Sequence, residues 1–125
     1  MFLIITIQIL LLGCAGVGVF ESNDPLVKLN DANHLYSKQN RPLIAEKLIF
    51  EAITIYASNH DNHGLGNSHR EYGDLLLSPS ISEWEKVYRE SGFYDESVTF
   101  DNRAEKAKEH YKTAIDFYTL AEPKF

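Results

Sequence analysis

Residues 42–58 read PLIAEKLIFEAITIYAS, and this stretch decides the fold class. Its apolar residues recur every three or four positions, which is the spacing of one broad face of an α-helix. We expect the helix to start at about Asn40 with Pro42 just inside it, because the first helical turn does not use the N–H that proline lacks. The expected buried face contains Ala45, Leu48, Ile49, Ala52, Ile53 and Tyr56.

The same spacing predicts further helices before and after this stretch. Asp24 is an N-cap acceptor, and Ser82 with Glu85 has the spacing of a capping box. The cluster at residues 59–64 is typical of a turn between helices. No segment alternates apolar and polar residues for long enough to predict a strand, so we expect an all-α chain. The further helices cover residues 25–38 and about 65–77, 82–91 and 101–121.

Two helix patterns occur twice. Ala45, Ile49 and Ala52 share their spacing with Ala107, Tyr111 and Ala114, as Leu29, Ala32 and Tyr36 do with Leu65, Ser68 and Tyr72. Small residues at such positions let a neighbouring helix approach closely. Here the sequence resembles the tetratricopeptide repeat (TPR), a helix-turn-helix unit of about 34 residues. The resemblance implies one TPR-like domain over residues 25–125, with two units and an insertion at about 78–100 in the second.

The N-terminal segment has a different composition. All the charged residues, 12 basic and 18 acidic, lie after position 20. The apolar run at residues 2–12 fits the core of a secretory signal and falls short of the roughly 20 residues that span a bilayer. The single cysteine of the chain, Cys14, follows the run directly after Gly13. An uncleaved anchor helix over residues 2–20 is the alternative.

The tetrapeptide LLGC at residues 11–14 resembles the lipobox of bacterial lipoproteins. The resemblance implies that residues 1–13 are a signal peptide and that Cys14 is acylated, with palmitate among the acyl chains. Residues 14–24 would then be the lipidated cysteine and its tether. Ala15, rather than Asp, follows the cysteine, which in a Gram-negative host implies the outer membrane, on its periplasmic side.

Charge and cysteine content exclude two classes of protein. A net charge of -6 and a pI near 5.3 argue against a nucleic-acid partner, which requires a basic face. One cysteine allows neither an internal disulfide framework nor a Cys-rich zinc site.

Few side chains are of the kinds that catalysis or metal binding requires. A zinc site requires three or four ordered ligands, so we interpret the histidines near residue 61 as part of a solvated turn. Ser68 and His69 are about 100° apart on a helix and cannot face each other as a triad with Asp74 would require. We therefore expect no enzyme, no cofactor and no metal. The metal-ligand types are His60, Asp61, His63 and His69, and the carboxylates expected on solvated faces are Glu46, Glu51, Glu105 and Glu109.

The insertion is rich in aromatic residues, with Arg89 and Arg103 nearby. Aromatic residues beside arginine are typical of a protein-binding hot spot. The same residues could instead fold back and cap the open end of a two-unit stack, which is the interpretation we favour, and the two roles can coexist. The aromatic residues are Trp84, Tyr88, Phe93, Tyr94 and Phe100; the candidate partner-binding residues are Trp84, Tyr88, Arg89, Phe93 and Tyr94.

These observations predict a membrane-tethered envelope lipoprotein that acts as a protein–protein interaction module through TPR-like helices. Its partner would be another envelope protein or peptide, or a second copy of the chain, because two repeats are fewer than the roughly three that usually bury their faces. The alternative is a structural subunit or spacer of an envelope assembly, with no dedicated ligand groove.

Overall fold

The structure, a computed structural model, describes residues 22–123. Within these residues no strand is present, which confirms the all-α prediction. The predicted signal peptide, Cys14 and the tether up to residue 21 lie outside the described residues. None of the helices in residues 22–123 is long and apolar enough to cross a membrane. The helices are α1 (Pro25–Lys38), α2 (Pro42–Ser58), α3 (Asn62–Leu76), α4 (Pro79–Glu83), α5 (Glu85–Ser91) and α6 (Arg103–Ala121).

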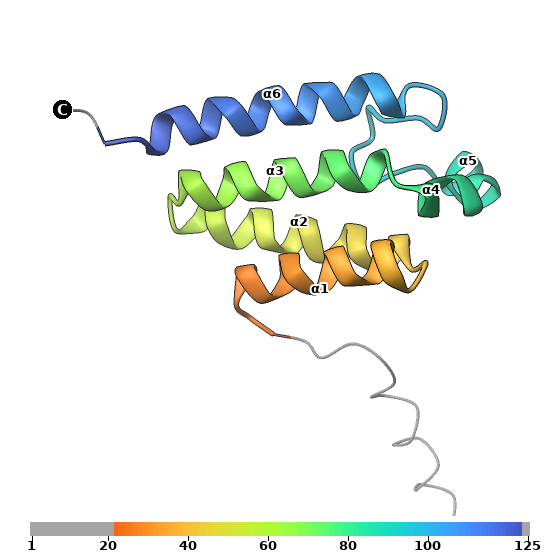
Figure 1. The fold of residues 1–125 in the computed structure, drawn as a ribbon, viewed down its shortest axis with the longest axis horizontal. Helices are drawn as coiled ribbons and strands as arrows, with labels where there is room; N and C mark the ends of the chain where they lie inside the picture. Colours follow the sequence, from red (N-terminus) through yellow and green to blue (C-terminus); the bar gives the residue numbers. More distant parts are fainter. Residues whose placement is uncertain (1–21, 124–125) are drawn as a thin grey trace, which may run out of the picture.

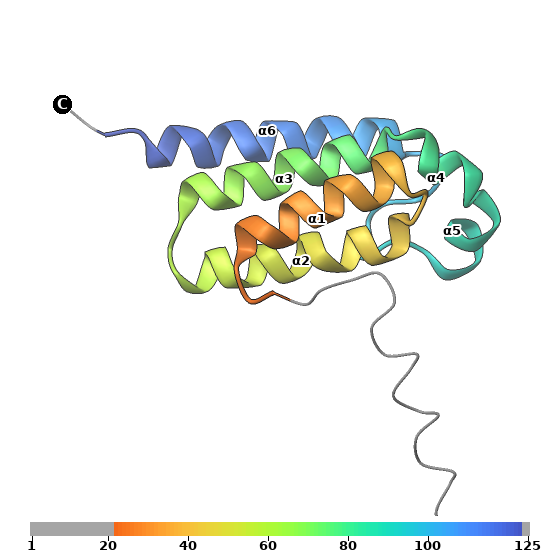
Figure 2. The ribbon, with the colours of Figure 1, turned by 60° about the horizontal axis from the view of Figure 1, so that its bottom comes forward.

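The four long helices lie side by side with their axes roughly parallel (Figure 1). The most extensive packing is between α3 and α6, followed by α1 with α2 and then α2 with α3. The chain therefore forms two helix pairs, α1/α2 and α3/α6, which meet mainly through α2 and α3. The short helices α4 and α5 lie at one end, beside the turn between α1 and α2 (Figure 2).

The predicted helix boundaries hold where the signal is local. The Asp24 side chain accepts a hydrogen bond from the Leu26 N–H at 2.9 Å, so α1 begins as expected. Helix α3 begins at Asn62 rather than near residue 65, because Asp61 caps it by accepting from the Gly64 N–H at 2.9 Å. The capping-box prediction at Ser82 is wrong, since that residue lies inside α4.

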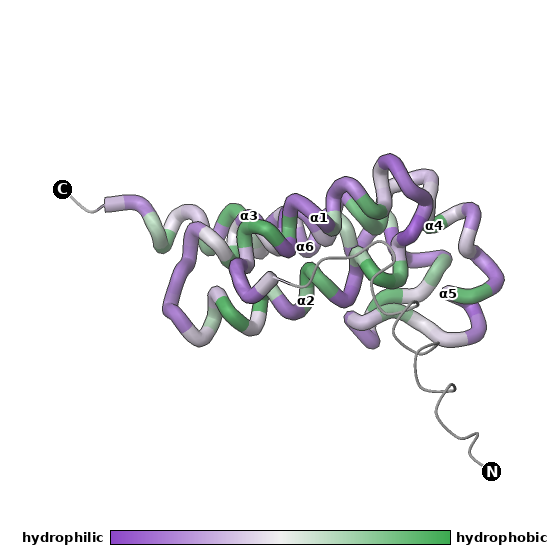
Figure 3. The backbone as a smooth tube through the Cα atoms, turned by 90° about the horizontal axis from the view of Figure 1, so that it is seen from below, coloured by the Kyte–Doolittle hydropathy of each residue, from purple (hydrophilic) through white to green (hydrophobic). Residues whose placement is uncertain are grey.

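The buried faces follow the repeated pattern. In Figure 3, hydrophobic and hydrophilic stretches alternate along α1, α2 and α3, as expected of helices with one buried side. Tyr111 is partly buried, whereas the other eleven repeated positions are buried. These eleven are Leu29, Ala32, Tyr36, Ala45, Ile49, Ala52, Leu65, Ser68, Tyr72, Ala107 and Ala114.

Helix α6 approaches α3 closely at two glycines. A Cβ atom on Gly66 would lie 2.6 Å from the Tyr118 ring, and one on Gly73 would lie 2.6 Å from the Tyr111 ring. Both glycines and both tyrosines are two helical turns apart, so the same contact occurs twice along the antiparallel pair. Only glycine leaves room there for a tyrosine ring against the backbone of α3. The Tyr118 and Tyr111 hydroxyls donate to Asn67 and Asp74, at 2.6 Å each.

Candidate functional site

Glu46 on α2 is buried, which corrects the expectation that it lies on a solvated face. Its side chain is 1% exposed. The Oε2 atom accepts hydrogen bonds from the Tyr72 hydroxyl of α3 at 2.7 Å and from the Tyr94 backbone N–H at 2.8 Å. Of the other three carboxylates, Glu105 and Glu109 are exposed as expected, and partly buried Glu51 lies 3.5 Å from the Lys28 ammonium.

The surroundings of Glu46 destabilise its ionised form. Burial raises the pKa of Glu46 to about 7, although the hydrogen bonds from Tyr72 and Tyr94 lower it. The Asp95 carboxylate raises this pKa further. Glu46 therefore changes its charge near neutral pH inside the fold.

The segment that covers Glu46 is the strap, residues 92–102, which connects α5 to α6. The strap leaves α5 at Gly92, whose φ of 77° favours glycine over any other residue. Tyr94 donates its N–H to Glu46, and the Asp95 N–H lies 3.5 Å from the Tyr72 hydroxyl oxygen. Phe93, Val98 and Phe100 of the strap are buried, so both polar and apolar contacts hold it on the helices.

A series of polar contacts continues from the strap through α6 to α3. The Asp95 Oδ2 atom lies 2.8 Å from His110 Nε2 of α6, and His110 Nδ1 lies 3.0 Å from His69 Nδ1 of α3. The two imidazole centroids are 5.2 Å apart with ring planes within 18°. Because the Nδ1 atoms are so much closer than the centroids, the rings meet edge to edge rather than face to face. One Nδ1 atom must therefore carry the proton and the other must accept it.

The pKa values of His69 and Asp95, two members of this series of polar contacts, are shifted. Burial lowers the pKa of His69 to about 4, with a further contribution from His110. Burial alone would raise the pKa of Asp95, but hydrogen bonds from Ser97 and His110 outweigh burial and leave this pKa lowered. Asp95 is thus a stable anion, and His69 resists protonation.

A second polar cluster joins α1 to α3 and has a structural role. Glu71 Oε1 accepts from the Tyr36 hydroxyl at 2.6 Å and from the Asn33 amide at 2.7 Å. Burial and Glu71 together raise the pKa of Tyr36. The cluster fixes how α1 sits on α3.

The structure does not bring together the residues whose types suit metal binding or a triad. In the described part of the chain no group of three or more His, Cys, Asp and Glu is placed to hold a metal ion. Asp61 caps α3, and His69 pairs with His110 instead of with His60 or His63. The Ser68 hydroxyl donates to the Gly64 carbonyl at 2.9 Å, which removes it from any nucleophilic arrangement with His69.

The candidate partner-binding residues differ in their exposure. Tyr88 and Phe93 are 1% and 7% exposed and stack with centroids 4.3 Å apart, so they lie in the core and not at a surface open to a partner. Trp84 is partly buried and donates its indole N–H to the Asn40 carbonyl at 3.0 Å. Arg89 and Tyr94 are exposed. Of the five candidates, Arg89 and Tyr94 are therefore the most accessible to a partner.

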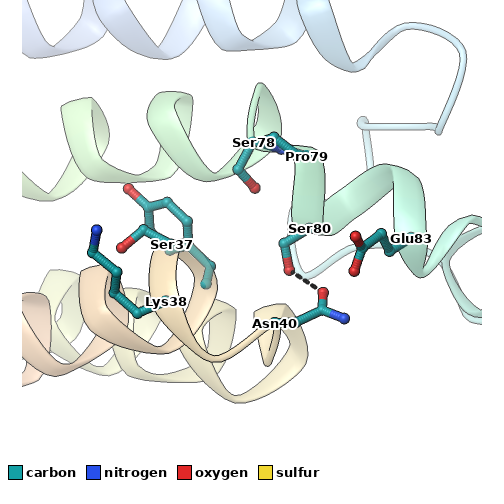
Figure 4. Close-up of a pocket in the computed structure, with 8 residues that line it drawn as sticks. Ser37, Lys38, Asn40, Ser78, Pro79, Ser80 and Glu83 are labelled. Atoms are coloured by element: carbon teal, nitrogen blue, oxygen red, sulfur yellow. Dashed lines mark hydrogen bonds between the residues drawn. The ribbon is translucent and has the colours of Figure 1, made fainter.

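An open pocket of about 460 Å³ lies along α5 beside Glu85, Lys86, Arg89 and Glu90, and two other pockets of the described residues are smaller. One of about 260 Å³ lies between the end of α1 and the start of α4, where Ser80 donates to Asn40 Oδ1 at 3.0 Å (Figure 4). Another, of about 200 Å³, lies between α5 and the strap. Ligand sites usually have about 300–1,000 Å³, so these two suit a single side chain better than a cofactor.

The sequence contained one overlooked signal for this site. Glu46 stands four residues after Pro42, three before Ile49 and seven before Ile53, so it shares their buried face. The carboxylate on an apolar face was a sign of a buried polar contact. Asp95 and His110 gave no such sign, because their partners are distant in sequence.

Two matched tyrosine substitutions test the hydrogen bonding around Glu46. The Tyr88 hydroxyl is buried and has no hydrogen-bond partner among the described residues, so Tyr88→Phe should leave the free energy of unfolding unchanged or raise it by about 1 kcal/mol. Tyr72→Phe removes the bond to Glu46 and should lower the free energy of unfolding by about 1–3 kcal/mol. Urea unfolding at pH 7 measures both, and equal losses would contradict this assignment.

Glu46 and His69 should make opposite contributions to the pH dependence of stability. The raised pKa of Glu46 stabilises the fold below the unfolded value of 4.5, and this contribution is lost as the pH rises to about 7. The lowered pKa of His69 acts in the other direction, and stability is lost as the pH falls from 6.5 to about 4. Between these limits the two slopes, each up to about 1.4 kcal/mol per pH unit, should largely cancel.

Substitution should separate the two slopes. The unfolding free energy of Glu46→Gln minus that of the wild type should rise with pH, and the same difference for His69→Asn should fall. Exposed His34→Asn is the matched control for the loss of an imidazole. If the differences in unfolding free energy for Glu46→Gln and His69→Asn do not change with pH, folding shifts the pKa of neither group.

Comparison with protein-family models, with curated proteins and with solved structures gives no match to this chain.

Proposed function

We propose that the chain is an envelope lipoprotein, tethered to the membrane through Cys14, that binds another protein through a TPR-like helical domain. The helix packing supports the TPR-like part of this proposal. Two helix pairs, α1/α2 and α3/α6, pack side by side, and eleven of the twelve positions that match between them are buried. Stacked helix pairs of this kind are the unit of repeat proteins that bind peptides or other helices.

The observation that carries the binding proposal is the position of Tyr94. Its side chain is 51% exposed, and its ring lies 5.3 Å from the ring of Phe50 on α2. Its backbone is fixed by the bond to Glu46. An exposed aromatic ring held on a rigid backbone loses little entropy on binding, which is a common feature of interface hot spots.

Arg89 makes a weaker contribution to such a surface. Its guanidinium already binds Glu85 at 2.7 Å and Asp101 at 2.9 Å, so a partner would have to compete with two carboxylates. Trp84 is held by Asn40 and is less accessible than Tyr94. The proposed contact is therefore centred on Tyr94, and the partner is a helix or an extended peptide that covers an aromatic ring.

Photo-crosslinking in intact envelopes tests this proposal. A benzophenone side chain at position 94 should give one saturable crosslink to another envelope protein. The matched control is the same side chain at Leu120, which is 62% exposed at the far end of α6 and should give no such product. Tyr94→Ala should abolish co-purification of that partner and leave the thermal midpoint unchanged within about 2 °C.

The outcomes separate the alternatives. Equal crosslinking at positions 94 and 120 would contradict a binding surface at Tyr94. Crosslinks only between copies of the chain would favour the structural subunit over the binding module. The same membrane extract tests the tether, because an unmodified segment still attached before Cys14 in its mass spectrum would rule out the lipoprotein.

A further inference from the structure

The pocket between the end of α1 and the start of α4 carries two opposite charges that no ion pair within the described residues neutralises. Lys38, in the last turn of α1, and Glu83, at the end of α4, both line it. Figure 4 shows the two side chains on opposite sides of the pocket. Neither makes an ion pair with the other or with a further residue of the described part of the chain. The ammonium and the carboxylate are therefore both available to a ligand.

Each of the two charged side chains has a hydroxyl group near it on its own helix. The Ser37 hydroxyl, beside Lys38, makes only a long contact of 3.5 Å within α1, so it can donate to a ligand oxygen. The Ser80 hydroxyl stands three residues before Glu83 and donates to Asn40 Oδ1 at 3.0 Å, which leaves its oxygen free to accept. One side of the pocket thus offers two donors, and the other side offers two acceptors.

The fold itself fixes the polar wall of the pocket. Asn40 follows α1 with a φ of 53°, in the left-handed region that asparagine tolerates better than most residues. Its carbonyl accepts the Trp84 indole N–H at 3.0 Å, and its side chain accepts from Ser80. The Ser78 hydroxyl donates to the Leu75 carbonyl at 2.8 Å. Groups held in this way lose little entropy when a ligand binds, so a small pocket can still hold a small molecule.

The size and the charges of the pocket select the class of ligand. Its volume is about 260 Å³, below the roughly 300 Å³ at which sites for larger ligands begin. An anion alone would leave Glu83 unpaired, and a cation alone would leave Lys38 unpaired. A small zwitterion satisfies both, because it carries a carboxylate and an ammonium group on one compact frame. Charge-assisted hydrogen bonds on both sides would also fix its orientation.

We propose that this pocket binds a small zwitterion, an amino acid or a dipeptide. The ligand carboxylate lies on Lys38 and Ser37, and the ligand ammonium group lies on Glu83 and Ser80. Tyr94 does not line the pocket, so this site is separate from the protein contact proposed above and goes beyond it. A bound zwitterion joins α1 to α4 and so fixes the insertion on the first helix pair.

Titration of the full chain by NMR tests the site, with alanine and alanyl-alanine as the two probes. The backbone amide signals of residues 37–40 and 78–83 should shift and saturate, with a dissociation constant of about 1 mM or lower for at least one probe. The probe that binds more tightly shows whether an amino acid or a dipeptide fits the distance between the two charges. Alaninamide and alanyl-alaninamide are the matched controls, because an amide replaces the carboxylate with little change of shape, and each should bind at least about tenfold more weakly than its acid.

Substitutions assign the two charges. Lys38→Gln and Glu83→Gln each remove one charge at an exposed position, so the fold should persist and the affinity should fall about tenfold. Lys112→Gln and Glu105→Gln change exposed residues of α6 that do not line the pocket, and both should bind as the wild type does. No saturable shift with either probe, or equal binding of the amides and the acids, would overturn the proposal. Unchanged affinity in both Lys38→Gln and Glu83→Gln would overturn it as well.

Discussion

Glu46 brings a carboxylate into the interior of the helical bundle, where α3 and the strap supply its hydrogen-bond donors. An isolated ionised carboxylate in an apolar interior costs several kcal/mol, so the group needs donors or a proton. Tyr72 supplies one donor from α3, and the Tyr94 N–H supplies another from the strap. The second donor comes from the strap between α5 and α6, so the strap's position satisfies Glu46 as well as burying Phe93, Val98 and Phe100.

A second constraint, the close contact between two glycines of α3 and two tyrosines of α6, sets the position of α6. Helix α6 lies against α3 because Gly66 and Gly73 leave space for Tyr118 and Tyr111. That register places His110, one residue before Tyr111, beside His69 and the strap. The glycine contacts therefore position α6, and the histidine pair links α6 and α3 to the strap.

Local patterns predicted most of the helices and little of the site. The start of α1 was predictable because Asp24 and Pro25 act within one turn. The start of α3 was missed because Asp61 was interpreted as part of a turn cluster, although it is the N-cap. The contacts of Asp95 with His110 and of His110 with His69 join residues 15 and 41 positions apart. Such pairs depend on how helices pack, and helical periodicity holds no information about them.

The most direct test of the buried state of Glu46 is a titration of its side-chain carboxyl by carbon NMR in the intact chain. The account predicts a midpoint near pH 7, because burial raises the pKa of Glu46 to about that value. The Tyr94 amide proton should shift with the same midpoint, since it donates to this carboxylate. A midpoint near the ordinary value of 4.5 would show that water reaches Glu46 and would contradict the account.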